Sequence, residues 1–156
     1  MIRALLFDFS RTLIFPKDAA YTEGNLNPLH ESLKAKNPDY PFLDYFELNH
    51  ALLAYLKTLK NRFKVCIFTT GYIQEAPQIQ DDLAFFDGIY SAEKMGSSKT
   101  NPEAYLQLAE KIGFRANEIL FVDDTKKNAD AASKAGMETL VFENNEALFS
   151  KLNALK

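Results

Sequence analysis

The sequence predicts an α/β fold: a mostly parallel, five-stranded sheet flanked by helices, with a short insertion after the first strand. Five short apolar runs alternate along the chain with segments of helical periodicity. Strands that alternate with helices typically form βαβ units, which have parallel strands and right-handed crossovers. The chain has 156 residues, which fits one domain, so we expect residues 1–156 to fold as a single unit.

The expected strands are short and rich in apolar residues, and they cover Ala4–Phe9, Lys64–Phe68, Gly88–Tyr90, Ile119–Val122 and Thr139–Phe142. Segments with apolar residues three or four positions apart are expected to be helices. They cover Pro28–Lys36, Tyr45–Asn61, Asn101–Ile112, Lys126–Ala135 and Glu146–Leu155. The helix after Asn101 has the clearest boundaries, because Pro102 lies near its start and Gly113 just past its end.

Residues 13–42 interrupt the alternation of strands and helices. The segment Pro16–Pro41 is rich in proline, asparagine and aspartate, and it is too long for an ordinary connection between two elements. We expect either a small lid over the carboxyl ends of the strands or a partly disordered insertion.

Composition and charge exclude several classes of protein. The net charge is −3 with 25% charged residues, so no basic excess suggests a nucleic-acid partner or a membrane surface. The apolar runs are far shorter than the roughly 20 residues that span a bilayer. The N-terminus has no signal-peptide layout. Cys66 is the only cysteine, which excludes an internal disulfide, and together these features favour the cytoplasm.

Three carboxylates follow expected strands that lie far apart in the sequence. Asp8 comes near the end of the first apolar run, and Asp123 and Asp124 directly follow Ile119–Val122. In an open α/β sheet, groups at the carboxyl ends of neighbouring strands meet in one crevice. Carboxylates gathered in this way need protons or a cation between them, and hard oxygen ligands suit Mg²⁺. We therefore expect a magnesium and phosphate site at this edge of the sheet.

Four segments that follow expected strands carry polar or charged residues of this kind. They are Phe7–Leu13, Ile67–Gly71, Ser97–Tyr105 and Val122–Asn128. In order and spacing they resemble the haloacid dehalogenase-like (HAD) superfamily, which consists mostly of phosphohydrolases. Residues 117–137 look like its helical-cap phosphatase branch. The resemblance implies a Rossmann-like HAD fold, with residues 13–42 as a reduced cap.

The resemblance also implies roles for the residues that bind and attack phosphate. Asp8 would be the nucleophile and form an aspartyl-phosphate, which splits one displacement into two easier steps. Thr69 would donate its hydroxyl to a phosphoryl oxygen, next to the backbone N–H groups of Thr70 and Gly71. Lys99 would place a positive charge against the nucleophile and the transferred group. The substrate would be a phosphorylated small molecule or a phosphoprotein.

The metal site implied by the resemblance uses four residues. The carboxylates of Asp8, Asp123 and Asp124 would hold Mg²⁺ together with the backbone carbonyl of Ser10. Asn128 would orient one of the acidic pair, or would be an ordinary residue of a helix surface.

Each of these residues also has a purely structural interpretation. The aspartates are common caps of turns and helices, Thr69 could simply end a strand, and most lysines are solvated. The remaining reactive side chains have no suitable neighbours in sequence, so we expect no catalytic role for His30, His50 or Cys66.

The first motif departs from the family pattern at two positions. Family phosphatases usually read Asp-x-Asp-Gly-Thr, whereas this chain reads Asp8-Phe9-Ser10-Arg11-Thr12. The second Asp of the pattern is the general acid and base, and the hydroxyl of Ser10 cannot exchange a proton near neutral pH. Arg11 replaces a glycine. Either it takes a strained positive φ, or its guanidinium points into the crevice and binds phosphate; the sequence leaves both open.

Two functions from different classes therefore follow. The first is a Mg²⁺-dependent phosphomonoester phosphatase, slowed because Ser10 replaces the acid. The second is a catalytically impaired module that binds phosphate or a phosphoprotein. Dehalogenase and phosphonatase chemistry are less favoured. Residues 13–42 look too short for a dehalogenase cap, and no lysine of the insertion stands out as a Schiff-base residue.

Overall fold

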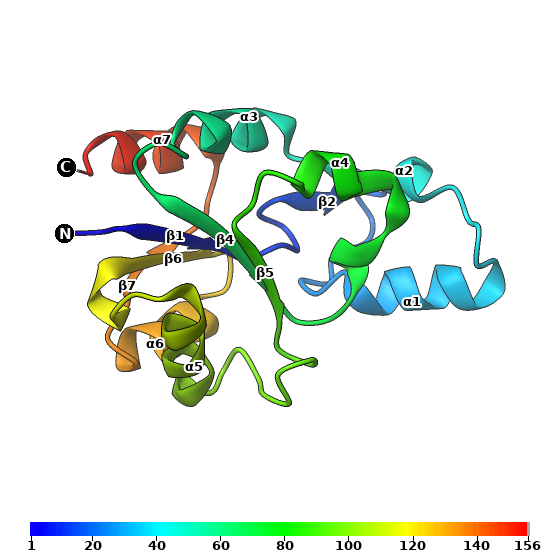
Figure 1. The fold of residues 1–156 in the computed structure, drawn as a ribbon. Coiled ribbons are helices and arrows are strands. Elements are labelled where there is room, and N and C mark those ends of the chain that lie inside the picture. Colours follow the sequence, from blue (N-terminus) through cyan, green and yellow to red (C-terminus); the bar gives the residue numbers. More distant parts are fainter. Residues whose placement is uncertain (156) are drawn as a thin grey trace.

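A five-stranded parallel sheet forms the centre of the molecule (Figure 1). The computed structural model describes residues 1–155, so Lys156, the last residue of the expected single unit, lies outside the described residues. The strand order is β5-β4-β1-β6-β7. The strands are β1 (Ala4–Phe7), β4 (Lys64–Thr69), β5 (Gly88–Ser91), β6 (Ile119–Asp123) and β7 (Glu138–Val141). All four pairings are parallel, as the alternation of strands and helices predicted.

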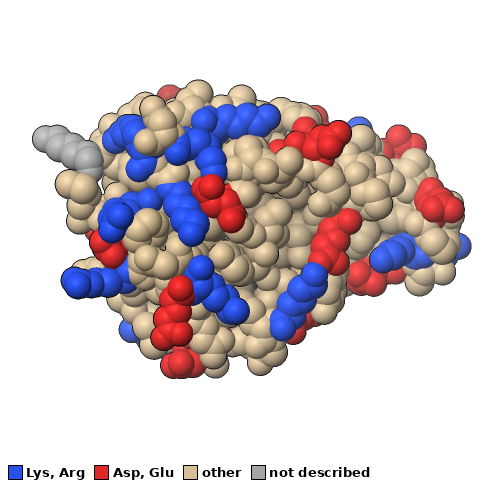
Figure 2. Space-filling view, in the orientation of Figure 1, with Lys and Arg blue, Asp and Glu red and all other residues tan. Residues whose placement is uncertain are grey.

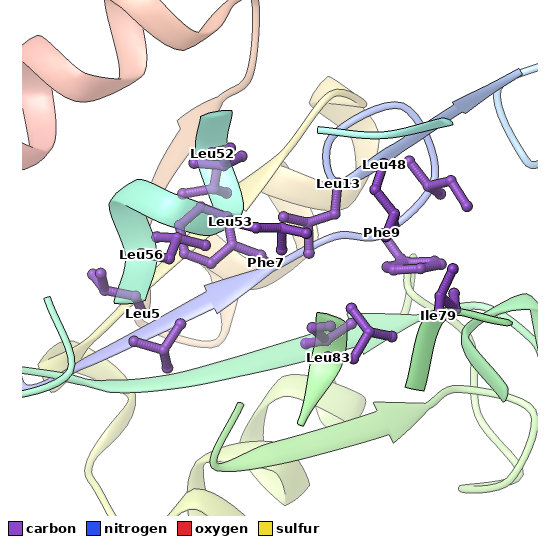
Figure 3. Packing of buried hydrophobic residues seen from close by; sticks show 14 of the residues in the cluster. Leu5, Phe7, Phe9, Leu13, Leu48, Leu52, Leu53, Leu56, Ile79 and Leu83 are labelled. Atoms are coloured by element: carbon purple, nitrogen blue, oxygen red, sulfur yellow. The ribbon is translucent and has the colours of Figure 1, made fainter. Parts of the chain in front are cut away.

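Helices cover both faces of this sheet. In Figure 1, α3 (His50–Thr58) and α7 (Asn145–Asn153) lie on one side, and α5 (Pro102–Ile112) and α6 (Lys126–Lys134) on the other. Successive side chains of β1 point to opposite faces, because strand side chains alternate. Leu5 and Phe7 accordingly belong to one apolar cluster, and Leu6 to the other. Figure 3 shows Leu5 and Phe7 beneath the leucines of α3.

The insertion is folded, and a small two-stranded antiparallel sheet, the β2–β3 sheet, joins its start to the residues that follow it. Strand β2 (Ile14–Pro16) pairs with β3 (Phe46–Leu48), and helices α1 (Asn27–Lys36) and α2 (Phe42–Tyr45) lie between them in the sequence. Figure 1 places the insertion at the end of the sheet where β1 finishes. Its helix α1 confirms the expected helix to within one residue. The role as a lid and the alternative of a partly disordered insertion both stay predictions.

The expected helix Tyr45–Asn61 was wrong at its start. Residues 46–48 form β3, because they pair with β2, a strand that the sequence analysis did not predict. The helix begins after Asn49, whose side-chain oxygen accepts a hydrogen bond from the backbone N–H of Leu52 and so caps it. The remaining short elements are α4 (Gln80–Leu83), η1 (Ile73–Glu75), η2 (Pro77–Ile79) and η3 (Ala116–Glu118).

The surface charges are unevenly distributed. Figure 2 shows basic side chains gathered on the side of the molecule where the N-terminus lies. Two lysines that share a surface pocket with Met1 are paired locally: Lys60 forms an ion pair with Asp87, and Lys64 donates to the carbonyl of Ile112. None of the helices within residues 1–155 combines the length and the apolar character that crossing a bilayer requires.

Candidate active site

Three carboxylates converge at the carboxyl end of the central strands. Asp8 directly follows β1, and Asp123 ends the neighbouring β6, with Asp124 next in the chain. The backbone N–H of Asp8 donates to the carbonyl of Val122 at 2.8 Å, which ties the two strand ends together. One oxygen of each carboxylate lies within 4.8 Å of the others. Asp123 is fully buried and Asp8 is 5% exposed, so their charges are poorly solvated.

Lys99 brings one positive charge into this cluster. Its ammonium forms an ion pair with Asp8 Oδ1 and lies 2.8 Å from Asp123 Oδ2. The residue is buried in the loop before α5, where the hydroxyl of Tyr105 donates to the Lys99 carbonyl at 2.6 Å. The rings of Phe68 and Phe121 lie 5.6 Å from the ammonium and close its apolar surroundings. The loop and the two aromatic rings thus hold Lys99 against the carboxylates.

Burial and crowding shift the pKa values of these groups. Burial is the largest influence on Asp8 and raises its pKa well above the usual value; Lys99 opposes this, whereas the other two carboxylates reinforce it. Burial by itself would lower the pKa of Lys99, but Asp8 and Asp123 outweigh it and the net shift is upward. Burial also raises the pKa of Asp124. Three carboxylates share one ammonium, so the cluster favours either a proton or a further cation.

Asp123 and Asp124 are held by the start of helix α6. The backbone N–H of Thr125 donates to Asp123 Oδ1 at 2.8 Å, and the side-chain amide of Asn128 donates to Asp123 Oδ2 at 3.1 Å. The Thr125 hydroxyl donates to Asp124 at 3.3 Å. Asn128 therefore contacts one of the acidic pair. Asp124 remains partly exposed, so its carboxylate is the one most accessible from solvent.

The end of β4 lies beside β1 and supplies the third side of the site. Thr69 is its last residue and is buried. Thr70 and Gly71 follow, and the next two backbone N–H groups, those of Tyr72 and Ile73, donate to Asn27 Oδ1 at 2.8 and 2.9 Å. A Cβ on Gly71 would lie 2.7 Å from the same oxygen, so this close approach requires glycine. Asn27, which begins α1, was not among the expected site residues; in sequence it resembles an ordinary helix start before a proline.

Known proteins resemble this chain in sequence and in fold. Residues 39–136 match the family model "haloacid dehalogenase-like hydrolase". This chain is a HAD-like hydrolase. It is 23% identical over 132 residues to bifunctional epoxide hydrolase 2 of Sus scrofa, covering 80% of the chain and 24% of that protein. It is 37% identical over 60 residues to enolase-phosphatase E1 of Persephonella marina, covering 38% of the chain and 26% of that protein. The chain thus spans about a quarter of the length of these relatives.

Solved structures of HAD proteins share the fold. A HAD family enzyme from Bacteroides thetaiotaomicron, in complex with magnesium and inorganic phosphate, superposes with a TM-score of 0.69 at 16% identity, covering 96% of this chain and all of that one. A HAD-like family hydrolase from Porphyromonas gingivalis has a TM-score of 0.73 at 19% identity over the full length of both chains. At these identities the likeness establishes the Rossmann-like HAD fold of the sheet and its helices.

The two residues that depart from the HAD first motif both bind the insertion. The Ser10 hydroxyl is buried and accepts a hydrogen bond from the backbone N–H of Leu26 at 3.2 Å. Arg11 has a φ of 61°, the left-handed region that favours glycine, and it donates through Nε and Nη2 to the carbonyls of Glu23 and Tyr21 at 2.8 and 2.7 Å. The positive φ confirms the first interpretation of Arg11, and these two donors of its guanidinium hold the insertion. A contact of Arg11 with phosphate stays a prediction.

An open groove of about 640 Å³ has Asp124 and Arg11 among its lining residues. One wall is the β2–β3 sheet, and the other is formed by residues 142–145, which run from the end of β7 to the first residue of α7. The sequence analysis did not anticipate it, because its lining comes from separate segments whose residues show no common motif.

Proposed function

We propose that this HAD-like hydrolase is a Mg²⁺-dependent phosphomonoester phosphatase that works through an aspartyl-phosphate on Asp8. The observation that carries the proposal is the buried Lys99 ammonium held against Asp8 within a cluster of three carboxylates. A carboxylate so placed is desolvated, oriented and next to a positive charge, as a nucleophile for a phosphate dianion needs to be. The phosphatase names among the relatives, and the magnesium and phosphate in a structure of the same fold, support this choice.

The donor set fits Mg²⁺. The carboxylates of Asp8, Asp123 and Asp124 would hold the ion together with the backbone carbonyl of Ser10, and hard oxygen ligands of this kind are those that Mg²⁺ prefers. Three carboxylates against one ammonium leave the cluster with excess negative charge, which would repel a phosphate dianion. When bound, the ion neutralises that charge and the charge of the phosphoryl group.

The residues of the chain would divide the work of two displacements. In the first, an oxygen of Asp8 attacks phosphorus and the bond between phosphorus and the ester oxygen breaks. In the second, water attacks phosphorus, the bond to Asp8 breaks and inorganic phosphate leaves. Lys99 offsets charge at the nucleophile and at the transferred group, while Thr69 and the backbone N–H groups of Thr70 and Gly71 would donate to phosphoryl oxygens.

Both displacements should be slow because Ser10 replaces the general acid and base. The leaving oxygen must take its proton from solvent, and no carboxylate at that position deprotonates the water. General acid–base help is typically worth about 10²–10⁴-fold. Aryl and acyl phosphates should suffer least, because their leaving groups have low pKa values and hardly need protonation.

A second function is favoured by the contacts of Ser10 and Arg11. Their side chains, which stand where the HAD motif has its acid and its glycine, fasten the insertion to the first motif. A chain that has given these positions to structure could retain binding of Mg²⁺ and phosphate without turnover. This second candidate is a module that binds phosphate or a phosphoprotein.

One assay separates the two functions. Under the first, aryl phosphate hydrolysis requires Mg²⁺ and disappears in Asp8→Asn but persists in Asp81→Asn, which changes an exposed aspartate of α4. Under the second, no ester is hydrolysed, yet Mg²⁺ and inorganic phosphate together raise the melting temperature. Crystals soaked with Mg²⁺ and beryllium fluoride would show an adduct on Asp8 if it is the nucleophile. Density elsewhere would contradict that assignment.

A further inference from the structure

Two asparagines that line the groove, Asn49 and Asn145, already have their polar groups paired. The amide of Asn49 donates to Asn145 Oδ1 at 2.8 Å and to the carbonyl of Thr12 at 3.0 Å, and Asn145 donates back to Asn49 Oδ1 at 2.9 Å. Asn49 Oδ1 also accepts the capping bond from Leu52. These bonds join the segment that follows β3 to the start of α7. They link the two walls of the groove, the β2–β3 sheet and residues 142–145. The side chains of Asn49 and Asn145 have little hydrogen-bonding capacity left for a ligand.

Each wall of the groove offers one phenylalanine and one glutamate. Phe15 and Glu47 are opposite each other in the β2–β3 pairing, so their side chains lie on the same face of this small sheet. The other wall presents Phe142 and Glu143. The backbone N–H of Phe142 donates to the carbonyl of Asp123 at 2.8 Å, which anchors that wall to the catalytic strand.

The polar groups left free in the groove are mainly acceptors. Within residues 1–155, the carboxylates of Glu47 and Glu143 have no hydrogen-bond or ion-pair partner. Arg11, the basic residue of the lining, gives Nε and Nη2 to carbonyls of the insertion. A groove lined by glutamates and phenylalanines suits a positively charged group, because an ammonium is attracted both by a carboxylate and by the face of an aromatic ring.

The groove and the carboxylate cluster together have opposite electrostatic preferences. Lys99 and a bound cation in the carboxylate cluster favour a phosphoryl dianion, whereas the groove lining carries the carboxylates of Asp124, Glu47 and Glu143 against a single guanidinium, that of Arg11. We infer that the groove binds the alcohol part of the substrate and selects phosphomonoesters whose alcohol bears a protonated amine a few bonds from the phosphate. The substrate class is thus a zwitterionic aminoalkyl phosphate. This inference rests on the proposed phosphatase function and names its substrate class.

Three matched esters test the inference: propyl phosphate, 3-aminopropyl phosphate and 2-carboxyethyl phosphate. With Mg²⁺ at neutral pH and low ionic strength, kcat/KM should be highest for the amine and lowest for the carboxylate. The amine should exceed the propyl ester by about tenfold, the size expected for two solvated carboxylates and a cation–π contact. The preference should shrink as salt is added. Equal values for the amine and the propyl ester would overturn the inference.

Variants locate the source of the preference. The double variant Glu47→Gln with Glu143→Gln should reduce the ratio of kcat/KM between the amine and the propyl ester to near one. Glu138→Gln, a matched change of an exposed glutamate on β7 outside the groove, should leave the ratio as in the wild type. A ratio that survives in the double variant would mean that the groove does not select the amine.

Binding to the Asp8→Asn variant separates this inference from the phosphatase proposal, because no turnover is required. Calorimetric titration in the presence of Mg²⁺ should show tighter binding of 3-aminopropyl phosphate than of propyl phosphate. If the wild type hydrolyses none of the esters but this variant prefers the amine, the phosphatase proposal fails and the groove assignment stands. If the esters are hydrolysed at equal rates and bound equally, the phosphatase proposal stands and the groove assignment fails.

Discussion

Replacing Lys99 with methionine should destabilise the protein in a way that depends on pH. Methionine keeps most of the length of the side chain and removes its charge, so Asp8 and Asp123 lose the ammonium that both of them contact. All three residues are at most 5% exposed, so water cannot replace the ion pair. Removing one partner of a buried ion pair typically costs about 3–5 kcal/mol. For a protein of this size, that corresponds to a melting temperature lower by roughly 6–20 °C.

The pH dependence follows from how the carboxylates can escape that cost. A buried carboxyl without a cation takes up a proton, so the folded-state pKa of Asp8, already raised by burial, rises further above the unfolded value of about 4. At low pH both states are protonated and the loss is small. Relative to the wild type, the loss develops as the pH rises through the raised folded-state pKa of Asp8 in the wild type, and it is complete above the still higher folded-state pKa in the variant.

Urea unfolding of the metal-free protein, near pH 4.5 and near pH 7.5, measures this deficit relative to the wild type at the same pH. The matched control is Lys126→Met, because Lys126 pairs with Asp130 on the surface and its side chain is 79% exposed. The control should lose at most about 1 kcal/mol at either pH. If Lys99→Met unfolds at the same urea concentration as the control, or shows the same deficit at both pH values, the picture of a buried charge cluster is wrong.

Three further predictions concern the first motif and the insertion. Ser10→Asp should raise alkyl phosphate turnover by up to about 10²–10⁴-fold and aryl phosphate turnover by less, and no gain in a folded variant that still binds Mg²⁺ would place the defect elsewhere. The free energy of unfolding should be about 1 kcal/mol lower for Arg11→Ala than for Arg11→Gly, because both variants lose the bonds to the insertion but only glycine is free of strain at a φ of 61°. The opposite order in urea unfolding would refute the strain. Burial lowers the pKa of His30, which is hydrogen-bonded to Tyr40, so its contribution to stability should be full above an unfolded pKa of about 6.5 and lost as the pH falls. His30→Gln should flatten that pH slope in urea unfolding, whereas the exposed His50→Gln should keep it.

Much of the sheet and of its charge cluster could be predicted from the sequence. Buried parallel strands are continuous apolar runs, and this composition marks the central strands β1, β4 and β6, whereas the edge strands β5 and β7 have shorter apolar runs. Because parallel strands present their carboxyl ends at one edge, Asp8 and Asp123 were expected to meet, and their oxygens do lie close together. The prediction that Lys99 belongs to this cluster rested on its position in a motif that resembles the HAD superfamily, because no local pattern around Lys99 indicates it. Its burial against two carboxylates is visible only in three dimensions.

The β2–β3 sheet and the contacts of the insertion could not be predicted in the same way. A three-residue strand such as β3 has too short a pattern to compete with the helical periodicity that follows it, and its pairing with β2 alone decides its conformation. The same holds for Asn27, whose neighbours Tyr72 and Ile73 are more than forty residues away in sequence. Helical propensity carries no information about such partners.

The sequence by itself determined that this chain folds around a parallel sheet with acidic residues at one edge, because apolar runs and strand ends are local features of the chain. Only the tertiary structure decided that Ser10 and Arg11 fasten the insertion instead of facing free into the crevice, and that two glutamates and two phenylalanines line one groove. Hydrogen bonds and charge interactions act over a few ångströms in space, and a linear sequence does not record which residues come that close.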